Sequence, residues 1–163
     1  MSRPHRLDAS QYVGVRQYFL TICTYQRKRT LVDADTIALV WSQLLHIAVA
    51  EKFVFLAYCF MPDHLHAIVT GQSETGNFLR FVSSAKQQSS FAFAQITGRR
   101  LWQEGYFDRT VRRDESVPEL IKYIIENPVR AGLVRTVGAY PHWGSQVYSR
   151  EELLEFVARE CRG

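Results

Sequence analysis

Two apolar runs separated by only three residues constrain the fold of this chain more than any other feature. Phe53 to Phe60 and His64 to Thr70 are rich in residues that favour strands, and Pro62 marks a turn between them. Gly71 ends the second run. Because so short a connection joins neighbouring antiparallel strands, the sequence predicts a β-hairpin in the middle of the chain.

A strand and a helix are predicted before the hairpin. Gln17 to Tyr25 is rich in β-branched and aromatic residues, which is typical of a strand. After a basic loop, apolar residues recur every three or four positions, and the pattern fades by Lys52. This spacing indicates a helix with one buried face, and Asp33 or Asp35 can cap its first turn.

A second helix and a fourth strand are predicted after the hairpin. Apolar residues between Phe78 and Ile96 recur with helical spacing, and Gly98 is placed to end that helix. Leu101 to Val111 is interpreted as a strand that Gly105 interrupts. The order βαββαβ is that of the ferredoxin-like arrangement, an α+β fold whose antiparallel sheet carries its helices on one face. We expect the opposite face to be free for a ligand.

The remainder of the chain predicts a third helix and a short C-terminal helix. The third helix begins near Ser116 and tolerates Pro118 in its first turn. It ends at or just before Asn127, because Pro128 disfavours helical geometry in the residue that precedes it. Glu151 to Glu160 is short and amphipathic, and it is predicted to close the fold.

Composition sets broad limits on structure and location. A chain of 163 residues that is 47% hydrophobic can build one core, so residues 1–163 are predicted to form a single domain with a flexible segment at residues 1–16. A net charge of +4 and a pI near 9.1 are compatible with a polyanionic partner. No segment is long enough to span a bilayer, so we expect a cytoplasmic protein. Neither a disulfide framework nor a thiolate zinc site is indicated by the three cysteines, Cys23, Cys59 and Cys161.

The second arm of the hairpin begins with His64 and His66, two positions apart. Successive strand residues point to opposite faces, so both imidazoles are predicted on one face and Leu65 on the other. Downstream, Tyr123 and Asn127 are four residues apart, close enough to share one face of the third helix. One phenol, one amide and two imidazoles can therefore converge, and the paired imidazoles have a metal-ligand geometry.

Three motifs together point to one family. They are Met-Pro-Asp-His-Leu-His at residues 61–66, Leu-Trp-Gln-Glu-Gly-Tyr-Phe at residues 101–107, and Tyr-Ile-Ile-Glu-Asn-Pro-Val-Arg-Ala-Gly-Leu at residues 123–133. In this combination and spacing the chain resembles the REP-associated tyrosine transposases. These are single-tyrosine HUH enzymes, similar to the transposases of the smallest single-strand insertion sequences. The likeness runs from about Tyr18 to Tyr148.

The resemblance implies a reaction and a role for each candidate residue. Tyr123 would attack a phosphodiester of single-stranded DNA, leaving a 5′-phosphotyrosine and a free 3′-hydroxyl. Such a covalent link conserves the energy of the broken bond for later strand transfer. His64, His66 and Asn127 would bind a divalent metal ion, Mg²⁺ or Mn²⁺, that acts as a Lewis acid on the scissile phosphate. No side chain in the sequence identifies itself as the base for the Tyr123 phenol.

The same resemblance implies a DNA partner. The substrate would be a REP hairpin flanked by a short guide tetranucleotide. The REP-associated group favours a monomer, whereas the related insertion-sequence transposases work as dimers, so both states stay open. Aromatic side chains such as Tyr106, Phe107 and Trp143 are candidates to stack on unpaired bases, at roughly 1–3 kcal/mol for each stack. Ten basic residues are candidates to follow the DNA backbone: Arg27, Lys28, Arg29, Lys86, Arg99, Arg100, Arg109, Arg112, Arg113 and Arg130.

Two other functions stay open on the residues alone. One is a non-catalytic single-stranded nucleic-acid binding domain of the same fold, although the aromatic RNP1 signature of RRM modules is absent. The other is a metal hydrolase that activates water, which predicts a carboxylate base at the metal and activity that survives Tyr123→Phe. A histidine pair or a tyrosine by itself is more often structural. Their combination with Asn127 favours the strand transferase.

Overall fold

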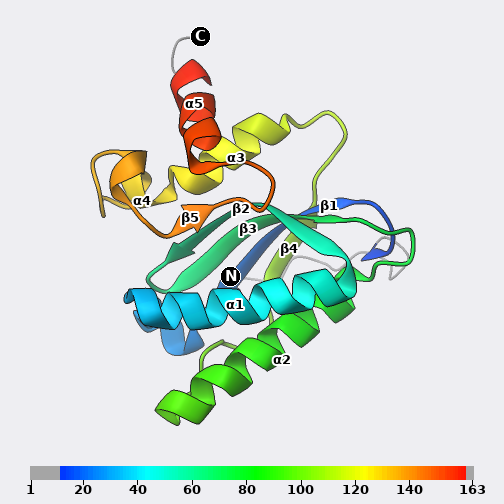
Figure 1. The fold of residues 1–163 in the computed structure, drawn as a ribbon, viewed down its shortest axis with the longest axis vertical. Coiled ribbons are helices and arrows are strands. Elements are labelled where there is room, and N and C mark those ends of the chain that lie inside the picture. Colours follow the sequence, from blue (N-terminus) through cyan, green and yellow to red (C-terminus); the bar gives the residue numbers. More distant parts are fainter. Residues whose placement is uncertain (1–11, 161–163) are drawn as a thin grey trace.

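Five strands form one antiparallel sheet in the order β4-β1-β3-β2-β5 (Figure 1). The structure is a computed structural model that describes residues 12–160. The predicted hairpin is confirmed as the pair β2 and β3. The strands are β1 (Gln17–Cys23), β2 (Phe53–Met61), β3 (His64–Gly71), β4 (Phe107–Thr110) and β5 (Trp143–Gly144).

Helices cover both faces of this sheet. Helices α1 and α2 pack side by side on one face, and α3 and α5 lie on the other (Figure 1). The α-helices of the described residues are α1 (Ala34–Glu51), α2 (Phe78–Thr97), α3 (Val117–Ile125), α4 (Asn127–Arg130) and α5 (Arg150–Glu160). Short 3₁₀ turns occupy Tyr25–Arg27 and Val137–Ala139. None of the helices in this part of the chain has both the length and the apolar character needed to cross a membrane.

The ends of the first two helices follow local sequence signals. Of the two aspartates considered for the cap of α1, Asp33 is the one that accepts a hydrogen bond from the Thr36 amide, at 2.8 Å. Gly98 ends α2 with a φ of 67°, a left-handed conformation that glycine adopts without strain. The elements from β1 to β4 follow one another in the predicted βαββαβ order, which confirms an α+β, ferredoxin-like fold.

Alternating side chains divide the interior into two hydrophobic cores. In β1 and β3, Tyr18, Leu20, Leu65 and their alternate neighbours pack beneath α1 and α2. Strand β2 has a bulge between Phe55 and Ala57, which shifts its alternation by one residue. Because of this shift, the small residues at the centre of β2 lie in the second core, against α3. That core contains Ala57, Cys59, Ile68, Ile121, Ile124, Ile125 and Leu153.

The expectation that one sheet face is free for a ligand is wrong. The isoleucines of α3 are almost fully buried, and the structure places them against the face that was expected to be open. An apolar stripe of this kind must be covered, and the far side of the sheet is the surface available to cover it. The histidine end of this face therefore lies beside α3 and α4 rather than on an open platform.

The fourth strand is shorter than predicted, and a fifth strand was not anticipated. Strand β4 covers only Phe107–Thr110 of the predicted Leu101 to Val111. Trp102 instead forms an isolated bridge with Thr24 and donates its indole N–H to Ser89. Trp143–Gly144 pairs with the outer edge of β2 as β5, although a two-residue strand leaves no periodic pattern in the sequence.

The predicted flexible segment spans residues 1–16. Residues 1–11 lie outside the described residues. Within residues 12–16, Tyr12 is buried and its ring stacks with Tyr18 and Phe78. Val13 also forms a bridge with Asn77.

Substitution of Ile124 by alanine should destabilise the fold by about 2 to 5 kcal/mol, because it removes a fully buried side chain from the second core. Urea denaturation measures this change in the free energy of unfolding. Val49→Ala is the matched control, since Val49 is 74% exposed and its truncation should change stability little. A cost for Ile124→Ala no larger than that of Val49→Ala would contradict the proposed packing of α3.

Candidate active site

The hairpin turn places two imidazoles at the start of β3. The rings of His64 and His66 lie with their centroids 4.7 Å apart and their planes perpendicular. Both side chains are partly buried, whereas Leu65 between them is fully buried in the first core. The prediction that the two histidines share one face of the strand is confirmed.

Neighbouring side chains fix the orientation of each imidazole. Nδ1 of His64 lies 2.7 Å from an oxygen of Asp63, and Nδ1 of His66 lies 2.8 Å from the Thr21 hydroxyl. Thr21 is the register partner of His66 across β1 and β3. With both Nδ1 atoms in these contacts, both Nε2 atoms remain for a ligand. Metal-binding histidines in proteins commonly use the second nitrogen in this way.

Asn127, the first residue of α4, approaches the two histidines. Its side-chain Nδ2 lies 3.5 Å from Nε2 of His64. Because the oxygen and nitrogen of a side-chain amide can exchange places by rotation, the same position can present an oxygen ligand. The histidines and Asn127 therefore converge, although Asn127 is 63 residues from His64 in the sequence.

Contrary to the prediction, Tyr123 and Asn127 do not lie on one continuous helix. Helix α3 ends at Ile125, and Asn127 begins α4, with Glu126 as the residue between the two helices. Pro128 cannot donate the amide hydrogen bond that would continue α3, so the chain turns at this point. The turn directs Asn127 towards His64 while Tyr123 stays on α3.

Tyr123 is 51% exposed and lies on the histidine face of the sheet. Its ring centroid is 6.2 Å from that of Phe19, and the Phe19 centroid is 6.0 Å from that of His66. Phe19 is therefore the contact between the tyrosine and the imidazoles. The Arg130 guanidinium covers the Tyr123 ring at 4.0 Å from its centroid.

Burial keeps both imidazoles neutral near neutral pH. Desolvation lowers the pKa of His66 to about 4, aided by the neighbouring His64 and then by the positive charges of Arg130 and Arg27. Burial also lowers the pKa of His64, although its hydrogen bond with Asp63 acts in the opposite direction. Burial alone would raise the pKa of Asp63, but hydrogen bonds with His64 and Arg27 outweigh it and lower that pKa. Neutral imidazoles are the form that binds metal ions.

Comparison with known proteins identifies the family. The sequence profile described as "Transposase IS200 like" matches residues 13–127, which include the histidines, Tyr123 and Asn127. The chain belongs to the IS200-like transposase family. A REP-associated tyrosine transposase of Escherichia coli (strain K12) is 24% identical over 135 residues, which is 80% of this chain and 76% of that protein. This transposase is thus a DNA-processing enzyme, and the resemblance to REP-associated tyrosine transposases is confirmed.

Solved structures support the fold. A REP-associated tyrosine transposase bound to a REP hairpin is similar with a TM-score of 0.71 at 22% identity, over 88% of this chain and 82% of that one. A bacterial tRNA(His) guanylyltransferase-like protein in complex with GTP also shares the architecture, with a TM-score of 0.52 at 12% identity, over 88% of this chain and 90% of that one. The fold by itself therefore does not determine the chemistry.

The predicted basic residues of the transposase separate into three groups. Arg27, Arg109 and Arg130 surround the site, through an ion pair with Asp63, contact with the Phe19 ring and contact with the Tyr123 ring respectively. Lys86 lies on α2 and donates to the carbonyl oxygens of Gln103 and Gly105. The other candidates are exposed and are not in contact with the histidines or Tyr123: Lys28, Arg29, Arg99, Arg100, Arg112 and Arg113.

Three residues of the site were missed by the sequence analysis. Asp63 and Thr21 orient the imidazoles, and Phe19 contacts the rings of both His66 and Tyr123. Alternation along the predicted first strand already places Phe19 and Thr21 on one face. What that pattern lacks is the register between β1 and β3, which decides that Thr21 lies opposite His66.

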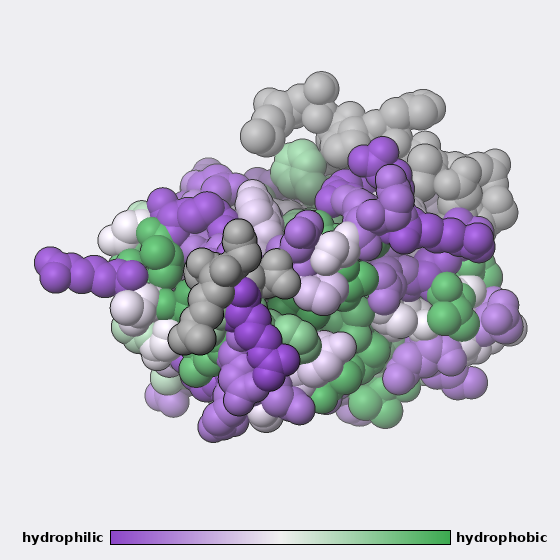
Figure 2. Space-filling view, turned by 90° about the horizontal axis from the view of Figure 1, so that it is seen from above, coloured by the Kyte–Doolittle hydropathy of each residue, from purple (hydrophilic) through white to green (hydrophobic). Residues whose placement is uncertain are grey.

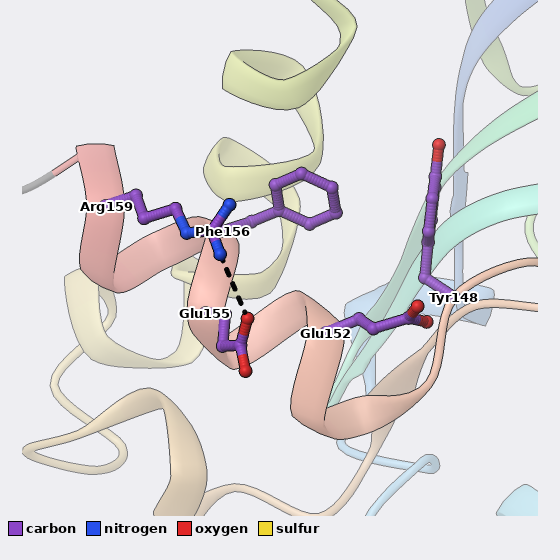
Figure 3. Close-up of a pocket in the computed structure, with 5 residues that line it drawn as sticks. All are labelled: Tyr148, Glu152, Glu155, Phe156 and Arg159. Atoms are coloured by element: carbon purple, nitrogen blue, oxygen red, sulfur yellow. Dashed lines mark hydrogen bonds and ion pairs between the residues drawn. The ribbon is translucent and has the colours of Figure 1, made fainter.

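A surface cavity of the transposase lies away from the histidines. One cavity of about 210 Å³ lies along α5 and is lined by Tyr148, Glu152, Glu155, Phe156 and Arg159 (Figure 3). The surface seen from above α5 is mainly hydrophilic, with hydrophobic side chains in separate patches (Figure 2).

Within residues 12–160, no group of three or more His, Cys, Asp or Glu side chains is arranged to hold a metal ion.

Acid should destabilise the fold between about pH 6.5 and pH 4. An unfolded histidine titrates near 6.5, whereas the pKa of His66 in the folded chain is about 4. The unfolded state therefore binds more protons in this window, so the free energy of unfolding decreases as the pH falls. His66 contributes at most about 3 kcal/mol to this decrease, and His64 and His142, whose pKa values are also lowered, act in the same direction.

Urea denaturation at about pH 7.5 and about pH 4.5, with a chelator present to remove metal ions, measures this change in the free energy of unfolding. His66→Gln should lose less stability between the two conditions than the wild type, because the variant lacks the titrating group. Equal losses in the two proteins would refute the assignment.

Proposed function

We propose that this transposase cleaves and rejoins single-stranded DNA at REP-type hairpins, with Tyr123 as nucleophile and a divalent metal ion bound by His64, His66 and Asn127. The observation that carries this proposal is the convergence of Asn127 on His64, with Nδ2 3.5 Å from Nε2, on the sheet face that also carries Tyr123. Tyr123 belongs to neither hydrophobic core.

The ligand atoms of His64, His66 and Asn127 are of the kinds that bind divalent metal ions. Two neutral imidazoles and one amide oxygen are ligands that suit Mn²⁺, and they suit Mg²⁺ when water and phosphate oxygens complete its shell. Asp63 and Thr21 support the imidazoles from the side opposite their Nε2 atoms. When bound, the ion supplies positive charge that polarises the scissile phosphate.

In this proposal Tyr123 carries out the reaction in two steps. Its phenol oxygen attacks phosphorus, a new P–O bond forms, and the bond from phosphorus to the 3′-oxygen breaks. The phenol loses its proton and the departing 3′-oxygen gains one, so the products are a 5′-phosphotyrosine and a 3′-hydroxyl. Attack by the same or another 3′-hydroxyl reverses these steps and releases Tyr123. Because the phosphotyrosine retains a phosphodiester, rejoining needs no external energy source.

The DNA partner is supported by charge and by similarity. Positive side chains lie beside the histidines, where the scissile phosphate would bind, and the net charge is +4. The similar transposase of known structure was solved with a REP hairpin. Since Tyr123 and the histidines lie on one face of the same chain, we propose that a monomer is sufficient for cleavage.

Tyr123→Phe should abolish the covalent protein–DNA adduct that the wild type forms with labelled hairpin DNA and Mn²⁺, because phenylalanine has no nucleophilic oxygen. Denaturing gel electrophoresis detects the adduct as a labelled protein band. Tyr148→Phe is the control, since Tyr148 lies beside α5 and should form the adduct normally. Cleavage that survives in Tyr123→Phe would indicate a hydrolase, and a wild type that binds DNA without cleaving it would indicate a binding module.

Asp63→Asn should weaken Mn²⁺ binding by about 10- to 100-fold, because the carboxylate that holds His64 in its metal-binding orientation is lost. Titration calorimetry measures this affinity without DNA. His64→Ala should abolish binding at the site, and Asp114→Asn, in an exposed loop, should leave it unchanged. Unchanged affinity in both Asp63→Asn and His64→Ala would exclude the proposed metal site.

A further inference from the structure

Arg130 makes three contacts that all involve the Tyr123 region. Its guanidinium lies over the Tyr123 ring, with Cζ 4.0 Å from the ring centroid. It also donates a hydrogen bond to the Tyr123 carbonyl oxygen and lies 3.8 Å from the Glu126 carboxylate. A stacked guanidinium gains both electrostatic attraction and contact area from an aromatic ring.

The turn between α3 and α4 creates this contact. Arg130 and Tyr123 are seven residues apart, a spacing that would place them nearly 11 Å apart along the axis of a straight helix, at about 1.5 Å for each residue. Helix α3 instead ends at Ile125 and α4 begins at Asn127, with the buried Pro128 in this short second helix. The chain thus returns the guanidinium to the ring.

The Tyr123 ring has few other restraints. Ile121 and Ile124 bury the neighbouring backbone, but the tyrosine side chain itself is 51% exposed. Within residues 12–160 its hydroxyl makes no hydrogen bond, and Phe19 is the one other aromatic side chain in contact with its ring. Arg130 therefore supplies the main polar restraint on the orientation of the ring.

We propose that Arg130 is a positioning residue that holds the Tyr123 ring, and thereby its phenol oxygen, in line with the scissile phosphate. This inference rests on the proposed function of Tyr123. It assigns Arg130 a role distinct from the DNA-backbone contact expected from the sequence, since its guanidinium is already engaged by the ring, the carbonyl oxygen and Glu126. Misplacement of a reacting group by about 1 Å is enough to reduce a rate by about 100-fold.

The test compares Arg130→Gln and Arg130→Lys with Arg159→Gln. Arg159 forms an equivalent ion pair with Glu155, four residues earlier on α5, so its variant controls for the loss of one exposed ion pair (Figure 3). The rate of adduct formation is measured in a single turnover with saturating hairpin DNA and Mn²⁺. DNA affinity is measured separately by fluorescence anisotropy at several salt concentrations.

Arg130→Gln should slow adduct formation by about tenfold or more, with DNA affinity and its salt dependence close to those of the wild type. Arg130→Lys should retain an intermediate rate, because lysine keeps the charge but loses the planar stack. Arg159→Gln should match the wild type in both measurements.

A measurement without DNA or metal reports the ring directly. With 3-fluorotyrosine in place of tyrosine, the ¹⁹F resonance that is missing from Tyr123→Phe belongs to residue 123. This resonance should shift and change its linewidth in Arg130→Gln but not in Arg159→Gln. A role confined to overall stability would leave this resonance in place at temperatures where the protein is folded.

Two results would overturn the proposal. If Arg130→Gln weakens DNA binding and reduces its salt dependence but reacts at the wild-type rate when saturated, Arg130 is a DNA contact. If it changes neither the rate nor the ¹⁹F resonance, it does not position Tyr123. In both cases the wild type would still form the adduct and Tyr123→Phe would still lack it. Failure of the proposed function itself would appear as cleavage or an adduct that survives in Tyr123→Phe, or as a wild type that forms no adduct.

Discussion

Burial of the α3 isoleucines against the sheet is the interaction on which the arrangement of this site depends. Ile121, Ile124 and Ile125 are nearly inaccessible to solvent, and they pack in one core with Ala57 and Cys59. These two residues are small, so the helix can approach the strand closely, and the bulge in β2 is what directs them to this face. With α3 fixed there, Tyr123 on its exposed side lies over Phe19, and the following turn reaches the histidines.

The break between α3 and α4 then determines which residues can act together. On a continuous helix, Tyr123 and Asn127 would project from the same face and compete for the same space beside the imidazoles. The turn at Glu126 separates their positions, so Asn127 approaches Nε2 of His64 while Tyr123 remains beside Phe19. The same turn returns Arg130 to the tyrosine ring. Pro128 thus accounts for the placement of the Tyr123, Asn127 and Arg130 side chains, which lie within eight consecutive positions of the sequence.

Features that depend on local sequence could be predicted, and features that depend on distant contacts could not. The hairpin, the Asp33 cap and the pairing of His64 with His66 on one face follow from turns, caps and strand alternation, which act over a few residues. The covering of the sheet by α3 depends on tertiary packing, because its isoleucine stripe specifies that a surface is covered without specifying which one. Strand β5 and the contact between Thr21 and His66 depend on register between segments far apart in the chain.

Charge balance around the histidines separates the roles of the nearby arginines. Arg27 pairs with Asp63 at 3.0 Å and Arg109 pairs with Glu115 at 2.9 Å, and in both pairs the arginine is about half exposed. Pairs this exposed contribute little to stability, typically about 0–1 kcal/mol, so a DNA phosphate can replace the carboxylate at small cost. Arg130 differs because a phosphate would also have to displace the tyrosine ring beneath it. In the proposed reaction Arg27 and Arg109 would therefore be available to bind a phosphate, whereas the position of Arg130 is coupled to that of the Tyr123 ring.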